Sequence, residues 1–328
     1  MNYTIQQITS EEEVKAAFEM ALRAFMEFVA PVYEDRAVRK FKADTVENND
    51  YINNYITSRH LMLGAFDGEQ IIGMITERGG GHISMVFTDK EYQRRGVATA
   101  IMERMVVRLK LMGHNRVTVN SSRYGLPFYR NFGFVPIDTE QNREGFIFTP
   151  MEYFPSELWD VYDRSRRKTG KIHERGRKLT QDEYHIVVHV WIKNSNGEWL
   201  ISKRTPNKTF PNMWECTGGS AVMGDDSITA AVREVKEELG VDLPPEKGVL
   251  FKSIIRENEF CPDICDIWVF HEDIPLESVV FQENETCGAM WASEEKIRDM
   301  IGKGEFVGKE IFSYLDELLE QWKMKVRK

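Results

Sequence analysis

The sequence has few cysteines and no long apolar run. Its 328 residues include four cysteines, which are too few and too scattered for a disulfide framework; they lie at positions 216, 261, 265 and 287. No stretch approaches the roughly 18 consecutive apolar residues of a membrane-spanning helix, and the N-terminus lacks the basic start and apolar run of a signal peptide. We therefore expect a cytoplasmic protein that does not span a membrane.

Positive charge is also in short supply. Lys and Arg total 43 against 52 Asp and Glu, which gives a formal net charge of −9. This acidic balance disfavours nonspecific binding to nucleic acid polymers and anionic lipids, because both are polyanions. Small soluble substrates are the expected partners, with local basic patches to hold phosphate groups.

The length predicts two domains, because 328 residues exceed what one hydrophobic core usually serves. The stretch 149–156 contains two prolines and little periodic pattern, so we place the boundary there. The predicted domains are residues 1–152 and 153–328.

Hydrophobic periodicity and turn residues predict the elements of both domains. In the first, we expect strands at 3–8, 61–66, 71–76, 82–87, 117–120 and 145–149, and helices at 10–29, 97–112 and 126–131. In the second, we expect strands at 186–193, 199–203, 249–255 and 267–271, and helices at 227–239, 293–300 and 308–322. The stretches 30–46 and 256–265 are expected to be loops that shape substrate specificity.

The strongest chemical pattern lies on the expected helix 227–239. Glu234, Glu237 and Glu238 are spaced i, i+3 and i+4, which places them on one helix face. Crowded carboxylates repel one another unless a cation lies between them, and Mg²⁺ or Mn²⁺ binds both carboxylate and phosphate oxygens. Gly219 lets the backbone approach a metal or phosphate closely, so Gly219 and the three glutamates form the expected metal site.

A solvated acidic helix face is the alternative interpretation of these glutamates. It does not explain the glycine pair 218–219 or the fixed offsets of Asp225 and Arg233. The whole segment 219–241, GSAVMGDDSITAAVREVKEELGV, resembles the Nudix signature, with Asp225 where the family usually has Glu.

The resemblance to the Nudix family implies an α/β/α sandwich that hydrolyses a diphosphate linkage. A divalent metal would activate water for attack on phosphorus and offset charge on the leaving phosphate. The resemblance implies that Glu234 and Glu238, followed by Glu237, bind this metal, while Arg233 orients them. Glu285 matches a position that in some relatives adds a ligand or a base.

Other residues resemble the branch of this family near isopentenyl-diphosphate isomerase; they are 157–163, Gly170, 184–185, 203–204 and 210–214. That isomerase needs a Cys just before the first glycine of the signature and a metal-binding His just after it. Here these positions are Gly218 and Ser220, and Cys216 lies two residues too early. Isomerisation is therefore a weaker alternative to hydrolysis.

A second chemical pattern lies in the first domain, in the segment 86–98, VFTDKEYQRRGVA. Unpaired N–H groups at the N-terminus of the helix that follows suit a pyrophosphate. The loop resembles the Q/R-x-x-G-x-G/A loop of GNAT acetyltransferases. This resemblance implies a mixed, mostly antiparallel sheet with flanking helices. It also implies an acetyl-CoA site formed by Val86, Gln93, Arg94, Arg95, Gly96, Val97 and Ala98.

A later block, 120–122 followed by 127–129 and 133–134, resembles a second motif of that family. The resemblance implies that Tyr129 protonates the leaving CoA thiolate and that Asn120 binds near the thiol. A Tyr129 that only packs on the cofactor is the alternative. The general base is not identifiable, and Glu77 and His82 are weak candidates.

The sequence thus predicts a bifunctional protein. One activity is a Mg²⁺- or Mn²⁺-dependent Nudix hydrolase of a diphosphate-linked small molecule, and the other is an acetyl-CoA-dependent N-acetyltransferase of an unknown amine. In an alternative of another class, one domain, most readily the first, is a ligand-sensing module without catalysis. The sequence does not identify either substrate.

Overall fold

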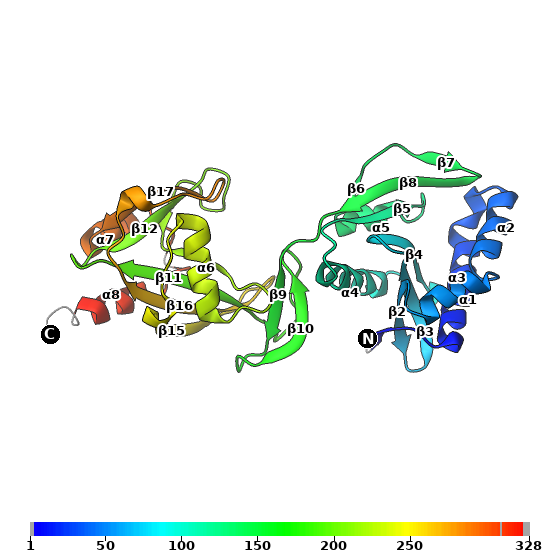
Figure 1. Ribbon diagram of the computed structural model, residues 1–328, viewed down its shortest axis with the longest axis horizontal. Helices are drawn as coiled ribbons and strands as arrows, with labels where there is room; N and C mark the ends of the chain where they lie inside the picture. The colour runs from blue at the N-terminus through cyan, green and yellow to red at the C-terminus, as the bar shows by residue number, and fades with distance from the viewer. Residues whose placement is uncertain (1–2, 309, 324–328) are drawn as a thin grey trace. The chain divides into compact units, whose positions relative to one another are not determined.

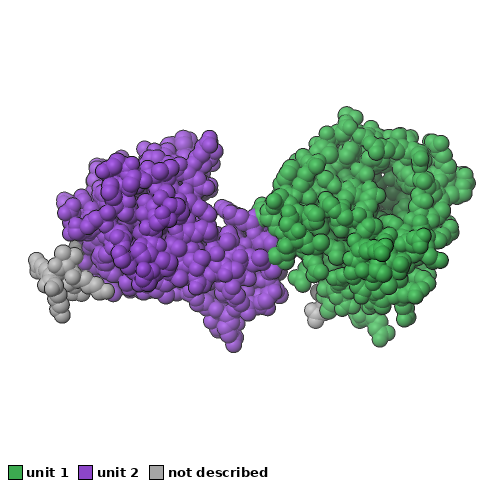
Figure 2. Space-filling view, viewed as in Figure 1, with its two compact units in different colours: residues 1–156 green, residues 157–328 purple. Residues whose placement is uncertain are grey.

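The computed structural model describes residues 3–308 and 310–323. The chain divides into two compact units, residues 1–156 and 157–328, which Figure 2 shows in different colours. The stretch 149–156 that we expect to link the domains begins inside a strand, because residues 149–153 belong to β8 (Phe146–Tyr153). None of the helices in the described residues is both long enough and apolar enough to cross a membrane.

Unit 1 is built around one mixed sheet with helices on both faces (Figure 1). Its strands are β1 (Thr4–Gln7), β2 (Leu61–Asp67), β3 (Gln70–Glu77), β4 (His82–Thr88), β5 (Val117–Ser121), β6 (Val135–Pro136), β7 (Gln141–Arg143) and β8. Its helices are α1 (Glu11–Phe28), α2 (Asp35–Asp44), α3 (Asn49–Ile56), α4 (Val97–Leu111) and α5 (Leu126–Phe132), with short 3-10 turns at Ala30–Val32 and Lys90–Tyr92.

The strand order of this sheet is β1-β2-β3-β4-β5-β8-β6, and β7 also pairs with β8. Among the described strands of this sheet, only β4 and β5 run parallel, and the other neighbours are antiparallel. This confirms the mixed, mostly antiparallel sheet that the sequence predicts.

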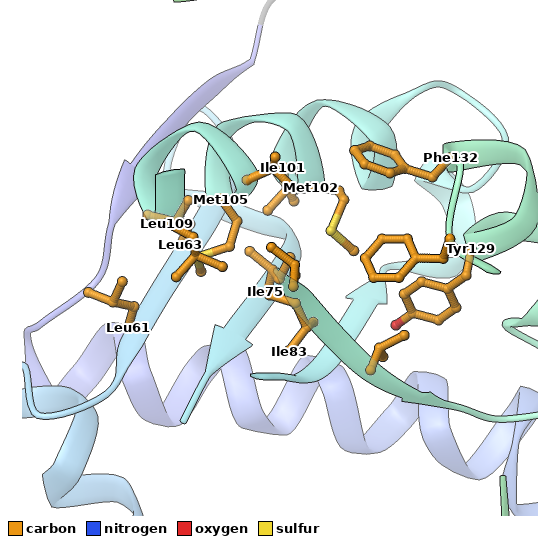
Figure 3. Packing of buried hydrophobic residues seen from close by; sticks show 14 of the residues in the cluster. Leu61, Leu63, Ile75, Ile83, Ile101, Met102, Met105, Leu109, Tyr129 and Phe132 are labelled. Carbon is orange, nitrogen blue, oxygen red and sulfur yellow. The ribbon is translucent and has the colours of Figure 1, made fainter. Parts of the chain in front are cut away.

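Two apolar clusters cover the opposite faces of the sheet, because successive side chains of a strand point to opposite sides. Leu61 and Leu63 of β2 pack in one cluster with Ile101 and Met105 of α4. Met62, between them, packs with α1 in the other. Figure 3 shows the first cluster, with Leu61 and Leu109 at one end and Tyr129 and Phe132 at the other.

The prediction of a loop over residues 30–46 is wrong. A 3-10 turn occupies Ala30–Val32, and α2 occupies most of the remainder. The sequence of α2, DRAVRKFKAD, is mostly charged and buries only Ala37, so its apolar face is short and lies among charged residues. The next helix, α3, is also absent from our predictions and buries Ile52 and Tyr55.

Unit 2 contains a mixed sheet with helices on both faces and a separate hairpin before it (Figure 1). The hairpin strands are β9 (Leu158–Tyr162) and β10 (Lys168–Glu174). The sheet strands are β11 (His185–Lys193), β12 (Trp199–Arg204), β13 (Trp214–Glu215), β14 (Thr217–Ser220), β15 (Val249–Arg256), β16 (Asp263–His271) and β17 (Thr286–Ala292). The helices are α6 (Ser227–Leu239), α7 (Glu294–Lys303) and α8 (Leu315–Lys323), with 3-10 turns at Pro245–Lys247 and Leu276–Ser278.

The sheet of unit 2 has the order β13-β12-β11-β16-β15, with β14 paired to β11 and β17 to β12. β11 is parallel to β16, and it separates two cores. Val188 and Val190 face α6 in one core, whereas Trp191 lies in the core formed with α7 and α8. This confirms the α/β/α sandwich.

Two predicted boundaries in unit 2 differ from the structure. β16 begins at Asp263, inside the expected loop 256–265. The expected helix 308–322 begins only at Leu315, and residue 309 lies outside the described residues. The predicted helix 227–239 is confirmed at both ends, because Asp226 caps its start and Gly240, with a φ of +69°, ends it in the left-handed conformation.

Replacing this cap tests what fixes the start of α6. We expect Asp226→Ala to lower the free energy of unfolding of unit 2 by about 1 kcal/mol, as is typical of a lost N-cap. Hydrogen bonds from Thr229 lower the pKa of Asp226. The contribution is therefore present above the pKa of an unfolded aspartate, about 3.9, and is lost as the pH falls through the lower folded pKa.

Urea unfolding followed by tryptophan fluorescence measures this effect in unit 2, because all seven tryptophans lie after residue 156. The matched control is Asp226→Asn, which keeps a side-chain acceptor and should retain most of the stability. Equal losses in the two variants would contradict the role of the cap.

Candidate active sites

In unit 1, the parallel strands β4 and β5 separate along their length. They pair only at their starts, where His82 lies opposite Thr118 and Ile83 opposite Val119. β4 continues to Thr88 and β5 to Ser121, with no further pairing between them among the described residues. The diverging strands leave backbone groups free for a ligand between their C-terminal ends.

The loop after β4 leads directly into this region. Arg94 and Gly96 have φ angles of 57° and 82°, and Gly96 is the N-cap of α4 without any side-chain hydrogen bond to the helix. A Cβ on Gly96 would meet no atom within 4 Å, so the approach to the first turn of α4 is open. The unpaired N–H groups of that turn suit a pyrophosphate, as the sequence predicts.

Some of the other loop residues lie at the surface, and others pack into the core. Arg95 stacks over the Tyr92 ring, 5.6 Å from its centroid, and Gln93 accepts a hydrogen bond of 2.9 Å from the Tyr124 hydroxyl. Val97 is buried and Val86 packs against the same core cluster, so their side chains support the loop. Ala98 is half-buried in the first turn.

The Tyr129 side chain lies at the end of the core cluster that contains Ile83 and Val119 of the two separating strands (Figure 3). Its side chain is 7% exposed. Burial raises the pKa of Tyr129, so the group stays protonated at neutral pH. Asn120 of β5 is exposed.

The two weak candidates for a general base have structural contacts. The Glu77 carboxylate is 3% exposed and accepts a hydrogen bond of 3.0 Å from the Gly81 N–H, which closes the turn before β4. His82 Nδ1 lies 2.9 Å from Thr118 Oγ1, at the paired end of the strands, and burial lowers the pKa of His82 to about 4. Neither is brought to the open end of β4 and β5.

In unit 2, Arg233 organises the acidic residues of α6. Its Nη1 donates to Glu234 Oε1 and Glu237 Oε2, both at 3.0 Å, and its Nε donates to Asp225 Oδ2 at 3.0 Å. Its Nη2 donates to the Ser220 carbonyl at 3.0 Å. One guanidinium therefore connects the strand β14, the loop after it and the helix, as expected for a residue that orients carboxylates.

Glu234 and Glu238 lie on the protected side of α6. The Glu234 side chain is 13% exposed and lies against β14, since a Cβ on Gly219 would be 2.3 Å from the Glu234 carboxylate. Glu237 is 46% exposed and contacts Arg233 from the outer side. Any Cβ at position 219 would therefore force the Glu234 carboxylate to move.

Glu238 carries the least compensated charge of this cluster. It is 6% exposed, and its Oε2 has no hydrogen-bond partner among the described residues. Burial and the nearby charge of Glu215 raise the pKa of Glu238 to about 8. An uncompensated buried carboxylate is costly, so this position favours an added cation.

Two residues near Glu238 were missed by the sequence interpretation. Glu215 of β13 forms an ion pair of 2.5 Å with Arg204, and burial raises the pKa of Glu215. Lys208 forms an ion pair with Glu285 and interacts electrostatically with the carboxylate of Glu238. Lys208 thereby links the predicted Glu285 to the glutamates of α6. Both residues lie outside the Nudix-like segment, and no spacing in the sequence marks them.

No three His, Cys, Asp or Glu side chains within residues 3–308 and 310–323 converge as a finished metal site. The residues nevertheless fit a divalent cation. Glu238 has a free buried oxygen, Gly219 leaves the backbone open beside Glu234, and all donors in the set are the oxygen ligands that Mg²⁺ and Mn²⁺ prefer.

A cavity of about 240 Å³, the box pocket, opens beside Gly218, Gly219 and Ser220. Arg204 and Glu215 line it near the glutamates, Arg256 and His189 line it elsewhere, and Phe210, Ile311 and Phe312 give it apolar walls. A substrate in this pocket would contact Glu215 and Gly219, which adjoin the glutamates of α6, and a mainly apolar surface.

The histidines of β11 have structural partners. His185 stacks on Trp159, with ring centroids 4.1 Å apart, and burial lowers the pKa of His185 to about 4. His189 Nδ1 lies 2.8 Å from the Tyr314 hydroxyl, and burial lowers the pKa of His189 to about 3.

The residues expected for an isomerase are absent from the site. A Cβ on Gly218 would be 2.4 Å from the Val188 carbonyl oxygen, so the backbone leaves no room for a cysteine side chain there. Burial raises the pKa of Cys216 well above its ordinary value, so this thiol is not a nucleophile at neutral pH.

Comparison with known families agrees with both halves of this description. The family model of the acetyltransferase (GNAT) domain matches residues 29–154, and that of the NUDIX domain matches residues 183–315. An uncharacterised Nudix hydrolase of Listeria monocytogenes is 37% identical over 153 residues, which are 46% of this chain and 88% of that protein.

Two further proteins are each similar to a different unit of this chain. The isopentenyl-diphosphate Delta-isomerase of Escherichia coli is 27% identical over 104 residues, which are 29% of this chain and 57% of that protein. The PaiA N-acetyltransferase of Thermoplasma acidophilum, solved in complex with coenzyme A, is 19% identical, with a TM-score of 0.41, over 47% of this chain and 99% of that one.

The close approach at Gly219 yields a direct test. We expect Gly219→Ala to displace the Glu234 carboxylate and to weaken Mn²⁺ binding by about tenfold or more, as for the loss of one charged contact. Calorimetric titration of the protein with Mn²⁺ measures this. Gly302→Ala is the control, because a Cβ on Gly302 meets nothing within 4 Å; unchanged Mn²⁺ affinity in Gly219→Ala would contradict the assignment.

Proposed function

We propose that this chain, which belongs to the Nudix hydrolase family and carries a GNAT acetyltransferase domain ahead of its Nudix domain, catalyses two reactions. The second unit hydrolyses a small diphosphate-linked molecule with Mg²⁺ or Mn²⁺. The first unit transfers the acetyl group of acetyl-CoA to an amine. The partners are small molecules rather than nucleic acid polymers, and the cytoplasmic location expected from the sequence belongs to the same proposal.

The buried, uncompensated carboxylate of Glu238 is the observation that carries the hydrolase proposal. Glu234 and Glu238, with Gly219 beside them, would hold the divalent ion, and Glu237 would contribute from the outer side through its contact with Arg233. The ion, when bound, supplies activation of water and compensation of phosphate charge. Arg233 keeps the carboxylates oriented, and Glu285 is the proposed additional base or ligand.

Glu238→Gln tests this role with little change in shape. We expect phosphate release from a panel of diphosphate esters with Mg²⁺ to fall by about 100-fold or more, which is typical for the loss of one preorganised electrostatic group. The control, Glu246→Gln, removes an exposed carboxylate outside the site and should retain activity. Full activity in Glu238→Gln, or an inert wild type across the panel, would disprove the hydrolase assignment.

The acetyltransferase proposal rests on the open end of β4 and β5 and on the buried, protonated hydroxyl of Tyr129. The amine nitrogen would form a bond to the acetyl carbonyl carbon and lose a proton to solvent, and the carbon–sulfur bond would break. The CoA sulfur then takes the proton of the Tyr129 hydroxyl, which solvent restores. A raised pKa keeps this proton in place until the thiolate forms.

Tyr129→Phe removes only the hydroxyl. We expect kcat for acetyl transfer to fall by about 100-fold, within the range for loss of a general acid, with little change in acetyl-CoA affinity. Thiol release with a panel of amines measures kcat, and calorimetry measures affinity. Tyr55→Phe deletes another buried hydroxyl in the same unit and is the control.

The same measurements separate catalysis from ligand sensing. A wild type that binds acetyl-CoA but releases no thiol with any amine would identify unit 1 as a sensing module. Equal kcat in wild type and Tyr129→Phe would show that Tyr129 only packs on the cofactor.

A further inference from the structure

The box pocket contains a guanidinium that the proposed hydrolysis does not use. Arg256 ends β15, lines the pocket and is 22% exposed. Its Nε donates to Asp263 Oδ1 at 2.7 Å, and its Nη1 lies 3.5 Å from His189 Nε2. Its Nη2 has no hydrogen-bond partner among the described residues, so both N–H groups of this atom remain available to a ligand.

A chain of buried hydrogen bonds holds Arg256 in this position. Because a guanidinium only donates, His189 Nε2 must accept, and His189 Nδ1 then donates to the Tyr314 oxygen at 2.8 Å. The same oxygen accepts from Trp191 Nε1 at 2.9 Å, which leaves the Tyr314 proton to be donated to Cys216. Each hydrogen bond in this chain has a single possible donor and acceptor. The chain therefore holds the guanidinium in place on the side away from the pocket.

The charges around the pocket favour a neutral acceptor for the free donors. Asp263 pairs with Arg256, and Glu215 pairs with Arg204, so neither guanidinium contributes an excess positive charge. The remaining walls are largely apolar, with Phe210, Ile311 and Phe312. A second anionic group would have no compensating charge there, whereas a carbonyl or ring nitrogen would satisfy Arg256.

The size of the pocket limits the group further. Its volume of about 240 Å³ lies below the range of roughly 300–1,000 Å³ for pockets that enclose drug-sized ligands. A compact group that presents one ring to the pocket fits this description better than a large second nucleotide or a long chain. A short hydrocarbon would also fit, but it would remove water from the N–H donors of Arg256 without offering them a hydrogen-bond acceptor.

We propose that Arg256 is a specificity-determining residue. It donates from Nη2 to a neutral hydrogen-bond acceptor on the compact organic group of the diphosphate substrate, and thereby selects against diphosphates of plain hydrocarbons. This inference rests on the proposed hydrolysis at the same site, and it assigns the organic end of the substrate to the box pocket.

Two probes with the same diphosphate group test the proposal. Uridine 5′-diphosphate carries carbonyl acceptors on a ring, and dimethylallyl diphosphate carries only hydrocarbon. Calorimetric binding of each with Ca²⁺, which has the same oxygen-ligand preference as Mg²⁺, should show at least tenfold tighter binding of the uridine compound. Arg256→Lys keeps the positive charge beside Asp263 but loses the paired N–H groups of the guanidinium. It should weaken binding of the uridine compound about tenfold and leave binding of dimethylallyl diphosphate nearly unchanged.

Arg166→Lys is the matched control. Arg166 also pairs with a buried aspartate of β16, Asp266, and it contacts Ser253 of β15, but it does not line the box pocket. Tryptophan fluorescence during urea unfolding shows whether both variants remain folded. The control should keep the wild-type preference between the probes.

Three results would overturn the inference: no wild-type preference for the uridine compound, equal weakening of both probes in Arg256→Lys, or no effect of that change. Equal weakening would mean that Arg256 acts on the shared phosphates or through structure. Turnover of both probes with Mg²⁺ is measured separately. Selective binding without any turnover would disprove the proposed hydrolysis while leaving the role of Arg256 in recognition intact.

Discussion

The carboxylate of Glu238 is buried beside Glu215 and Glu234, where water compensates little of their charge. The surrounding contacts distribute the available positive charge among these acids. Arg233 holds Glu234, Arg204 holds Glu215, and Lys208 approaches Glu238 from a loop. One oxygen of Glu238 still lacks a partner among the described residues. The geometry of β14 and α6 thus leaves a buried carboxylate oxygen unpaired, and the proposed hydrolysis rests on the fit of this oxygen to an added cation.

Unit 1 obtains its candidate site from a different constraint, the early separation of two parallel strands. β4 and β5 pair at only two positions and then diverge, while α1 and α4 cover the two faces of the sheet. Backbone groups and the first turn of α4 become available at the same end, and Tyr129 closes the cluster beside them. The two candidate sites therefore form in different ways. The site of unit 2 concentrates charged side chains, whereas the site of unit 1 exposes backbone hydrogen-bond donors.

Local signals account for the elements that the sequence predicts well. The helix 227–239 has a capping aspartate, a terminal glycine and an apolar stripe, so both of its ends are encoded within a few residues. The helix α2 has only a short apolar stripe in a mostly charged sequence, and the strand β10 is mostly exposed, so neither has a strong local signal. Among site residues, the glutamates of α6 are encoded by helical spacing, whereas Glu215 and Lys208 have no local pattern that joins them to Glu238.

The sequence by itself determined the two fold families, the acidic face of α6, the glycine at 219 and the loop before α4, because each depends on residues that are neighbours along the chain. Only the tertiary structure decided which charges meet. It brought Glu215, Lys208 and Glu285 to the acids of α6, and it set Arg256 against His189 in the box pocket. These contacts join residues tens of positions apart, and their strength depends on distance and burial, which spacing along the chain does not specify.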